Sequence, residues 1–181
     1  MSNFIELSPF VHQYDFPISN LLTPHIDDII DQYKKSYPVI EGYSMPYFND
    51  KVTQKIGMDF VELIKNNYKV SSLMKPIQPH IYYQDKDHQK NDLHNHNSTS
   101  TVNAVFYLKL PKEGGGIEFV DEGGTPHQLH SPEIDKLYVF PYWLSHRPLP
   151  HTSDDIRISF NLEYFCVERP RHFATHETLM W

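Results

Sequence analysis

Residues 137–162, which read LYVFPYWLSHRPLPHTSDDIRISFNL, contain two β-strand patterns separated by a segment rich in proline and polar residues. The first is the apolar run 137–140, and the second lies within 156–167. In the second pattern, Arg157, Ser159 and Asn161 alternate with Ile158, Phe160 and Leu162. Since successive side chains of a strand point to opposite faces, this alternation predicts a strand with one polar and one apolar face.

Similar short patterns fill the C-terminal half of the chain. We expect strands at residues 77–84, 101–110, 116–120, 137–140 and 156–167. Turn signals separate them, in the glycine-rich segments 111–116 and 121–124 and in the segment 148–155. Short strands with frequent turns are typical of sandwiches and barrels, and the aromatic content of 14% also favours β-structure.

The N-terminal part is expected to contain a strand pattern followed by two helices. Residues 4–16 form the strand pattern, with a turn at Ser8-Pro9. Thr23 is expected to be a helix N-cap with Pro24 at the first helical position. A second helix is predicted at about residues 50–67, where apolar residues recur at helical spacing. This stripe consists of Val52, Ile56, Phe60, Leu63 and Ile64.

Both parts are predicted to form one domain spanning residues 1–181, because neither part alone would bury both of its faces. In this arrangement, helical support from about residues 18–67 covers a β core of about residues 77–167. The predicted fold class is therefore mainly β (α+β).

Composition narrows the range of functions. The formal net charge of −7 argues against a nucleic-acid partner that binds a broad basic surface. No apolar run is long enough for a membrane span, and no signal peptide is apparent, so we expect a cytoplasmic protein without membrane partners. The single cysteine, Cys166, lies in an apolar stretch and is expected to be a buried thiol.

Three histidines are candidates for metal binding. His94 and His96 are two residues apart, so on a strand their imidazoles would share one face. Imidazole suits iron, zinc, copper and nickel, but such a pair alone is a weak signal, and its spacing by itself favours a polar loop. His146 follows a strand and a proline-aromatic turn, which would place it at the mouth of a barrel. By contrast, we expect His130 and His151 in solvent-facing loops.

Arg157 is a candidate anion-binding residue. The fork of a guanidinium matches a carboxylate in bidentate geometry, and the hydroxyl of Ser159 on the same face would add one hydrogen bond. A solvated polar face is the alternative interpretation of the same pattern. If Arg157 is buried, however, it needs an anionic ligand, because a buried unpaired charge is costly.

Taken in order, these residues resemble the 2-oxoglutarate- and iron(II)-dependent oxygenases, and in particular a small branch from phages and bacteria. The resemblance covers residues 94–162, about 70 of the 181 residues. Its matching pieces are 94–96 (HNH), 105–108 (VFYL), 115–119 (GGIEF) with Asp121, 140–146 (FPYWLSH) and 157–161 (RISFN).

The resemblance implies a double-stranded β-helix, a jelly roll related to the cupins. It also implies an iron(II) site formed by His94, His96 and His146, with Arg157 and Ser159 binding the distal carboxylate of 2-oxoglutarate. The implied activity is a dioxygenase that uses O2 to hydroxylate a substrate while decarboxylating 2-oxoglutarate to succinate. If the chain is phage-encoded, its compartment would be the host cytoplasm.

The chain departs from the family pattern at the middle metal ligand, where the superfamily has an acid and this chain has His96. Asp92, two residues before His94, would share its face on a strand and is the alternative donor of a carboxylate. Asp121 is a poorer candidate because it lies in a glycine-rich turn. The string His94-Asn95-His96 does not indicate an HNH nuclease, since that motif is widely spaced and the chain is acidic.

Two other classes of function stay open on the sequence. One is a cupin-like metalloenzyme that does not use 2-oxoglutarate, and the other is a non-catalytic jelly roll with a binding or structural role. Further candidates for contacts in the site are Tyr82, Tyr83, Asn103, Tyr142 and Trp143. The sequence names neither the prime substrate nor an oligomeric state.

Overall fold

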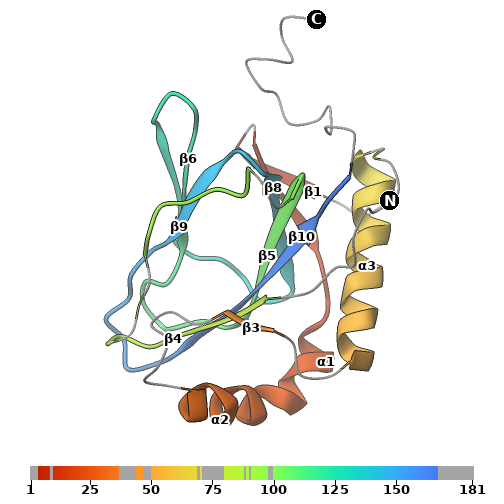
Figure 1. Cartoon of the computed structure of the whole chain (residues 1–181). Coiled ribbons are helices and arrows are strands. Elements are labelled where there is room, and N and C mark those ends of the chain that lie inside the picture. The colour runs from red at the N-terminus through yellow and green to blue at the C-terminus, as the bar shows by residue number, and fades with distance from the viewer. Residues whose placement is uncertain are drawn as a thin grey trace, which may run out of the picture.

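Two antiparallel sheets pack face to face, and helices cover the outer face of the larger one (Figure 1). The computed structural model describes residues 4–8, 10–36, 44–46, 50–68, 70, 80–87, 89, 91–97 and 100–166. The larger sheet has the order β1-β2-β8-β5-β10-β4-β3 and the smaller sheet the order β7-β6-β9. All ladders between these strands are antiparallel.

The larger sheet consists of β1 (Phe4–Ser8), β2 (Val11–Asp15), β8 (Lys136–Pro141), β5 (Val102–Lys109), β10 (Arg157–Tyr164), β4 (His80–Gln84) and β3 (Ser44–Pro46). The smaller sheet consists of β7 (Pro126–Leu129), β6 (Ile117–Val120) and β9 (Ser145–Pro148). The helical elements are α1 (Ser19–Leu22), a 3-10 turn η1 (Thr23–His25), α2 (Ile26–Ser36) and α3 (Asp50–Tyr68).

The larger sheet has an apolar core on each face. On the helix-covered face, Phe106 of β5 and Phe160 of β10 stack with ring centroids 4.8 Å apart. On the opposite face, Val105 and Tyr107 of β5 belong to a second core shared with the smaller sheet. Strand alternation therefore directs the polar set of β10 to the space between the two sheets.

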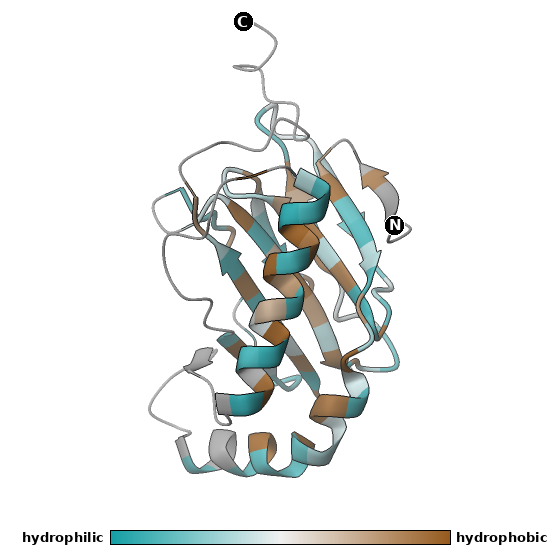
Figure 2. Ribbon diagram, turned by 90° about the vertical axis from the view of Figure 1, so that its right-hand side faces the viewer, coloured by the Kyte–Doolittle hydropathy of each residue, from teal (hydrophilic) through white to brown (hydrophobic). Residues whose placement is uncertain are grey.

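Helix α3 confirms the helical pattern predicted for residues 50–67. Ile56, Phe60 and Ile64 are fully buried against the larger sheet, and Val52 and Leu63 pack beside them. The apolar stripe of the helix runs along the sheet in Figure 2. Each fully buried side chain of this kind contributes roughly 1.5–3 kcal/mol, so the stripe holds the helical layer in place.

The predicted N-cap at Thr23 is wrong. The helical path begins at Ser19, and Thr23 itself has helical backbone angles (φ −50°, ψ −41°). Ser19 donates from its backbone N–H and its hydroxyl to the carboxylate of Asp135, at 2.8 and 2.9 Å. A side chain 116 residues away thus satisfies the start of the helix, a partner that local sequence cannot indicate.

The fold class predicted from the sequence is confirmed, and all five predicted strands of the C-terminal half are present. Residues 4–16 contain the two strands β1 and β2, and Pro9 of the turn expected at Ser8-Pro9 lies outside the described residues. Strands β3, β7 and β9 were not predicted, because each is only three or four residues long and carries little apolar alternation. No described helix is both long enough and apolar enough to span a membrane.

Candidate metal centre and anion pocket

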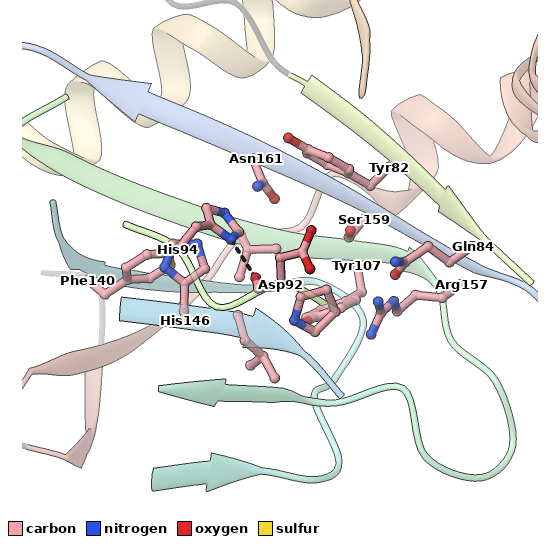
Figure 3. Close-up of a pocket in the computed structure, with 13 residues that line it drawn as sticks. Tyr82, Gln84, Asp92, His94, Tyr107, Phe140, His146, Arg157, Ser159 and Asn161 are labelled. Atoms are coloured by element: carbon pink, nitrogen blue, oxygen red, sulfur yellow. Dashed lines mark hydrogen bonds between the residues drawn. The ribbon is translucent and has the colours of Figure 1, made fainter. Parts of the chain in front are cut away.

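A cavity of about 320 Å³ lies between the two sheets, and the candidate residues line its two ends (Figure 3). His94 and His146 line one end, and Arg157 lines the other. Ser159 and Asn161, from the polar face of β10, lie along the wall. The alternation read from the sequence thus becomes one wall of a pocket, not a solvated face.

The histidines come from two segments that are far apart in the chain. His146 follows β8 and a turn, as expected, and it lies within β9, where it pairs with Phe119 of β6. His94 forms an isolated bridge with His146, with reciprocal backbone hydrogen bonds of 3.1 and 2.8 Å. His96 is outside any strand, and its N–H donates to the carbonyl of Tyr142 at 2.9 Å. This pairing brings the three imidazoles to one place.

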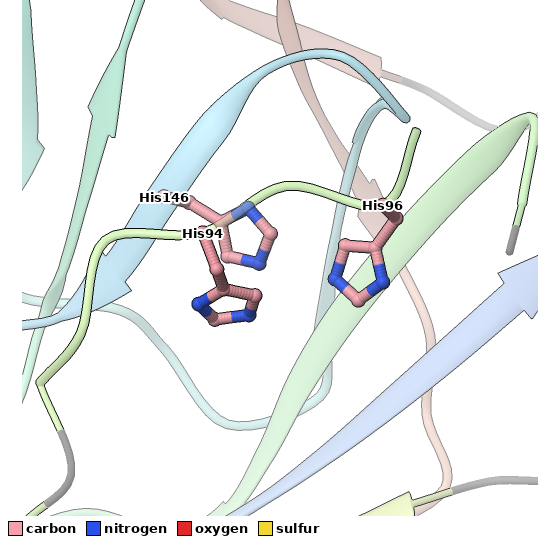
Figure 4. A group of neighbouring side chains, drawn as sticks. All are labelled: His94, His96 and His146. Atoms are coloured by element: carbon pink, nitrogen blue, oxygen red, sulfur yellow. The ribbon is translucent and has the colours of Figure 1, made fainter. Parts of the chain in front are cut away.

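The three imidazoles form a compact group (Figure 4). Their ring centroids are 4.4 Å apart for His94 and His146, 5.1 Å for His96 and His146, and 5.4 Å for His94 and His96. One ring nitrogen of each lies within 4.8 Å of the others. The group is a candidate metal centre in which each residue offers one nitrogen ligand.

Hydrogen bonds at the Nδ1 atoms leave the Nε2 atoms for a metal. Nδ1 of His94 donates to the carbonyl of Asp92 at 3.0 Å, and Nδ1 of His146 to that of Leu144 at 3.1 Å. Nδ1 of His96 lies 3.0 Å from the carboxylate of Glu163. All three partners are oxygen acceptors, so Nδ1 carries the proton and Nε2 presents a lone pair.

His146 is held neutral, as a metal ligand must be. Burial, with a smaller contribution from the proximity of His94, lowers the pKa of His146 to about 3. Its Nε2 atom is buried and has no hydrogen-bond partner among the residues that the structure describes. A buried polar atom without a partner is unfavourable unless a ligand satisfies it, and three imidazole nitrogens suit iron(II) or another transition metal. The residues present therefore fit a metal ion.

The carboxylate candidates occupy other positions. Asp92 lines the cavity and is exposed, but its side chain is not part of the group of neighbouring donors found among the described residues. Asp121 accepts a hydrogen bond from the N–H of Thr125 at 2.8 Å and contacts His127 at 3.2 Å. Asp121 therefore closes the turn between β6 and β7, as its glycine-rich surroundings indicate.

Arg157 is buried without an anionic partner among the described residues. Only 1% of its surface is exposed, and its Nη1 donates to the carbonyls of Gly115, Gly116 and Leu149 at 3.0, 3.1 and 3.2 Å. Its Nε atom is buried and has no partner. Burial lowers the pKa of Arg157, which the proximity of Tyr107 partly offsets. The carbonyls orient the guanidinium but supply no full negative charge, so the site requires an anion.

Gly115 supports Arg157 in a way that a larger residue would prevent. Its φ is +72°, and a Cβ there would lie 2.5 Å from Cγ of Pro111. We expect Gly115→Ala to cost about 1–2 kcal/mol for the left-handed backbone and a further 1–3 kcal/mol or so for the overlap. Gly124→Ala is the matched control, because Gly124 has φ +79° and open space around its Cβ position.

Urea denaturation of the two glycine variants measures the difference. The free energy of unfolding should fall more for Gly115→Ala than for Gly124→Ala. An equal loss in both would show that the Pro111 contact relaxes without cost, and that only the backbone angle matters at residue 115.

The register of β10 with its neighbouring strands determines which residues form the cavity wall between the histidine end and the arginine end. Ser159 of β10 lies opposite Tyr82 of β4 on one side and opposite Tyr107 of β5 on the other. Arg157 lies opposite Gln84, which also lines the cavity. Burial raises the pKa of Tyr107, so its hydroxyl stays protonated and is a hydrogen-bond donor near Arg157.

The structure also shows where the other residues singled out in the sequence analysis lie, and His151 does not lie where it was expected. His151 is buried, with 3% exposure, because Gln89 binds both its backbone N–H and its carbonyl and because Gly114 leaves room for it. His130 is exposed, as expected. Tyr83 faces the helix-covered core, and Trp143 packs against Phe10. Of the further candidates, Tyr82 lines the cavity.

Glu163 is the residue that the sequence analysis missed. The polar alternation on β10 continues beyond Asn161 to Glu163, which contacts His96. That continuation was visible in the sequence, but nothing local indicated that the polar face would reach the histidine group.

The fold that the two sheets and their helical layer define is a double-stranded β-helix. No family model matches the chain, and no curated sequence matches it. Among solved structures, it is similar to a prolyl-4-hydroxylase from Pseudomonas putida, with TM-score 0.64 and 18% identity over 87% of this chain and 93% of that one. It is also similar to a prolyl 4-hydroxylase from Phytophthora capsici, with TM-score 0.66 and 13% identity over 96% of this chain and 69% of that one.

A third similar structure is a prolyl hydroxylase from Trichoplax adhaerens in complex with a hypoxia inducible factor peptide fragment. It has TM-score 0.56 and 13% identity over 88% of this chain and 84% of that one. At these identities the likeness establishes the fold. The resemblance to 2-oxoglutarate- and iron(II)-dependent oxygenases is therefore confirmed at the level of the fold, and the phage and bacterial branch stays a prediction.

Proposed function

We propose that this protein is an iron(II)- and 2-oxoglutarate-dependent dioxygenase that hydroxylates an organic substrate. The observation that carries the proposal is one cavity lined at one end by His94 and His146 of the three-histidine group and at the other by buried Arg157, which has no anionic partner among the described residues. A keto acid with a second carboxylate would satisfy both ends together. The fold shared with prolyl hydroxylases supports the same assignment.

His94, His96 and His146 would hold the metal through their Nε2 atoms, with the ring tautomers set by the three Nδ1 contacts. When bound, iron(II) supplies the O2 activation that couples decarboxylation of 2-oxoglutarate to hydroxylation. In the balanced reaction, substrate, 2-oxoglutarate and O2 give hydroxylated substrate, succinate and CO2. One oxygen atom enters the substrate and the other enters succinate.

Arg157 would bind the distal carboxylate of 2-oxoglutarate, with the hydroxyl of Ser159 adding a hydrogen bond. Because the guanidinium is already held by three carbonyls, little conformational freedom is lost when the acid binds. Apolar side chains that line the same cavity, including Val105 and Ile117, would exclude water from the bound acid.

The prime substrate would approach from the histidine end. His94 and Asp92 are exposed, whereas Arg157 at the other end is almost completely buried. The co-substrate would therefore lie deep in the cavity and the reacting carbon of the prime substrate near His94. A peptide or a small molecule would fit this direction of approach.

The test is succinate formation from 2-oxoglutarate by the purified protein under air, with iron(II) and ascorbate. We expect slow turnover even without the prime substrate, and none when iron(II) is replaced by zinc. Metal binding without any 2-oxoglutarate binding would favour a cupin-like metalloenzyme. Binding of neither would favour a non-catalytic jelly roll.

A further inference from the structure

Glu163 lies at the end of β10 nearest the histidine group and binds one of its members. Its Oε1 atom is 3.0 Å from Nδ1 of His96, and both side chains are largely shielded, with 22% and 14% exposure. Glu163 shares the cavity-facing side of the strand with Arg157 and Ser159, because these residues alternate along β10. One strand therefore reaches both ends of the candidate site.

His96 differs from the other two histidines in the acceptor that its Nδ1 meets, which is a carboxylate and not a backbone carbonyl. His94 and His146 are fixed by reciprocal backbone hydrogen bonds, and their Nδ1 atoms donate to the carbonyls of the residues two positions earlier. His96 lies outside any strand. The carboxylate of Glu163 accepts a hydrogen bond from Nδ1 of His96, which leaves the lone pair of Nε2 available for a metal. The same hydrogen bond, from a residue of β10, fixes the orientation of the imidazole ring.

The contact also brings the negative charge of the Glu163 carboxylate next to a member of the histidine group. Three neutral imidazoles leave both positive charges of a divalent ion uncompensated, whereas two histidines and a carboxylate would compensate one. Among the described residues, His96 is the member of the group whose imidazole meets a carboxylate, whereas His94 and His146 meet backbone carbonyls. A carboxylate bonded to a ligand imidazole makes that ligand more basic and strengthens its bond to the metal.

We propose that Glu163 is a positioning residue of the metal centre, which orients His96 and supplies through it the negative charge that a carboxylate ligand would supply directly. This inference rests on the proposed function, because it assumes that the histidine group binds a metal. It explains how a site with His96 in place of an acid can retain a divalent ion.

Isothermal titration of the full-length apo protein with Co(II) at neutral pH tests the inference without any turnover. We expect Glu163→Gln to weaken Co(II) affinity by about 10–100-fold, the range typical when such a partner of a ligand histidine is changed. The glutamine has nearly the same shape and keeps an acceptor oxygen, so the charge is the main difference. Asp59→Asn is the matched control, because Asp59 forms an ion pair with Lys55 on the surface of α3.

A second background separates action through His96 from a general structural effect. In His96→Asp, the acid is placed directly at the ligand position, so adding Glu163→Gln should change Co(II) affinity by less than about twofold. An equal loss in both backgrounds would overturn the inference, as would unchanged affinity in Glu163→Gln alone. Thermal melting of the apo variants shows whether each remains folded.

The two proposals fail in different ways. If the wild-type protein binds no Co(II), the proposed function fails and this inference fails with it. If the wild type binds Co(II) and Glu163→Gln binds it equally well, only the role of Glu163 is lost.

Discussion

Replacing Arg157 with alanine should severely weaken 2-oxoglutarate binding, with the Kd rising by at least about 30-fold. Arg157 is the buried cation at the closed end of the cavity and has no carboxylate partner among the described residues. Removing one partner of a buried charge pair costs roughly 2–5 kcal/mol, because the other charge is then buried alone. Succinate formation should disappear in the same variant, whereas Co(II) affinity should be preserved.

Two comparisons sharpen this prediction. Arg157→Lys keeps the charge but loses the planar fork, so we expect an intermediate loss of affinity. Arg147→Gln is the control, because Arg147 is 45% exposed in its side chain and already pairs with Glu118 at 2.6 Å. Calorimetry with 2-oxoglutarate and the Co(II)-loaded protein gives the three affinities. If Arg157→Ala binds 2-oxoglutarate as tightly as the wild type, the distal carboxylate does not bind at this end of the cavity.

Replacing His146 with glutamine should reduce Co(II) affinity by at least about 100-fold, more than any change in a residue that only contacts a ligand. His146 is the most buried member of the histidine group, and its Nε2 atom has no partner in the described part of the chain. Glutamine is similar in size but offers a weak amide ligand in place of imidazole. Succinate formation should be lost together with metal affinity.

His130→Gln is the control for this experiment, since His130 is exposed and is not part of the metal-binding group. His94→Gln should behave like His146→Gln. If Co(II) binds His146→Gln as tightly as the wild type, the metal lies elsewhere and the exposed Asp92 becomes the first residue to test in its place.

Local sequence patterns were sufficient to predict much of the architecture. Helix α3 has one apolar face, and strand β10 has one apolar and one polar face, so periods of 3.6 and 2 residues are visible in their sequences. The same pattern placed Arg157 and Ser159 on one face of β10. Candidate ligands were also visible, as the closely spaced pair His94 and His96, as His146 after a proline-aromatic turn, and as Arg157 on the polar side of an alternating strand. Their assignment as metal and acid ligands stays a prediction.

Tertiary structure decided what depends on residues that are distant in the chain. The helical layer begins at Ser19 because Asp135 binds it, and His151 is buried because Gln89 holds its backbone. The three histidines meet only because His94 pairs with His146 across the ends of two separate segments. Glu163 and His96 are also distant in the chain, and they meet only in the folded structure. The sequence by itself determined which faces are polar, through local periodicity, whereas long-range pairing determined which polar groups meet.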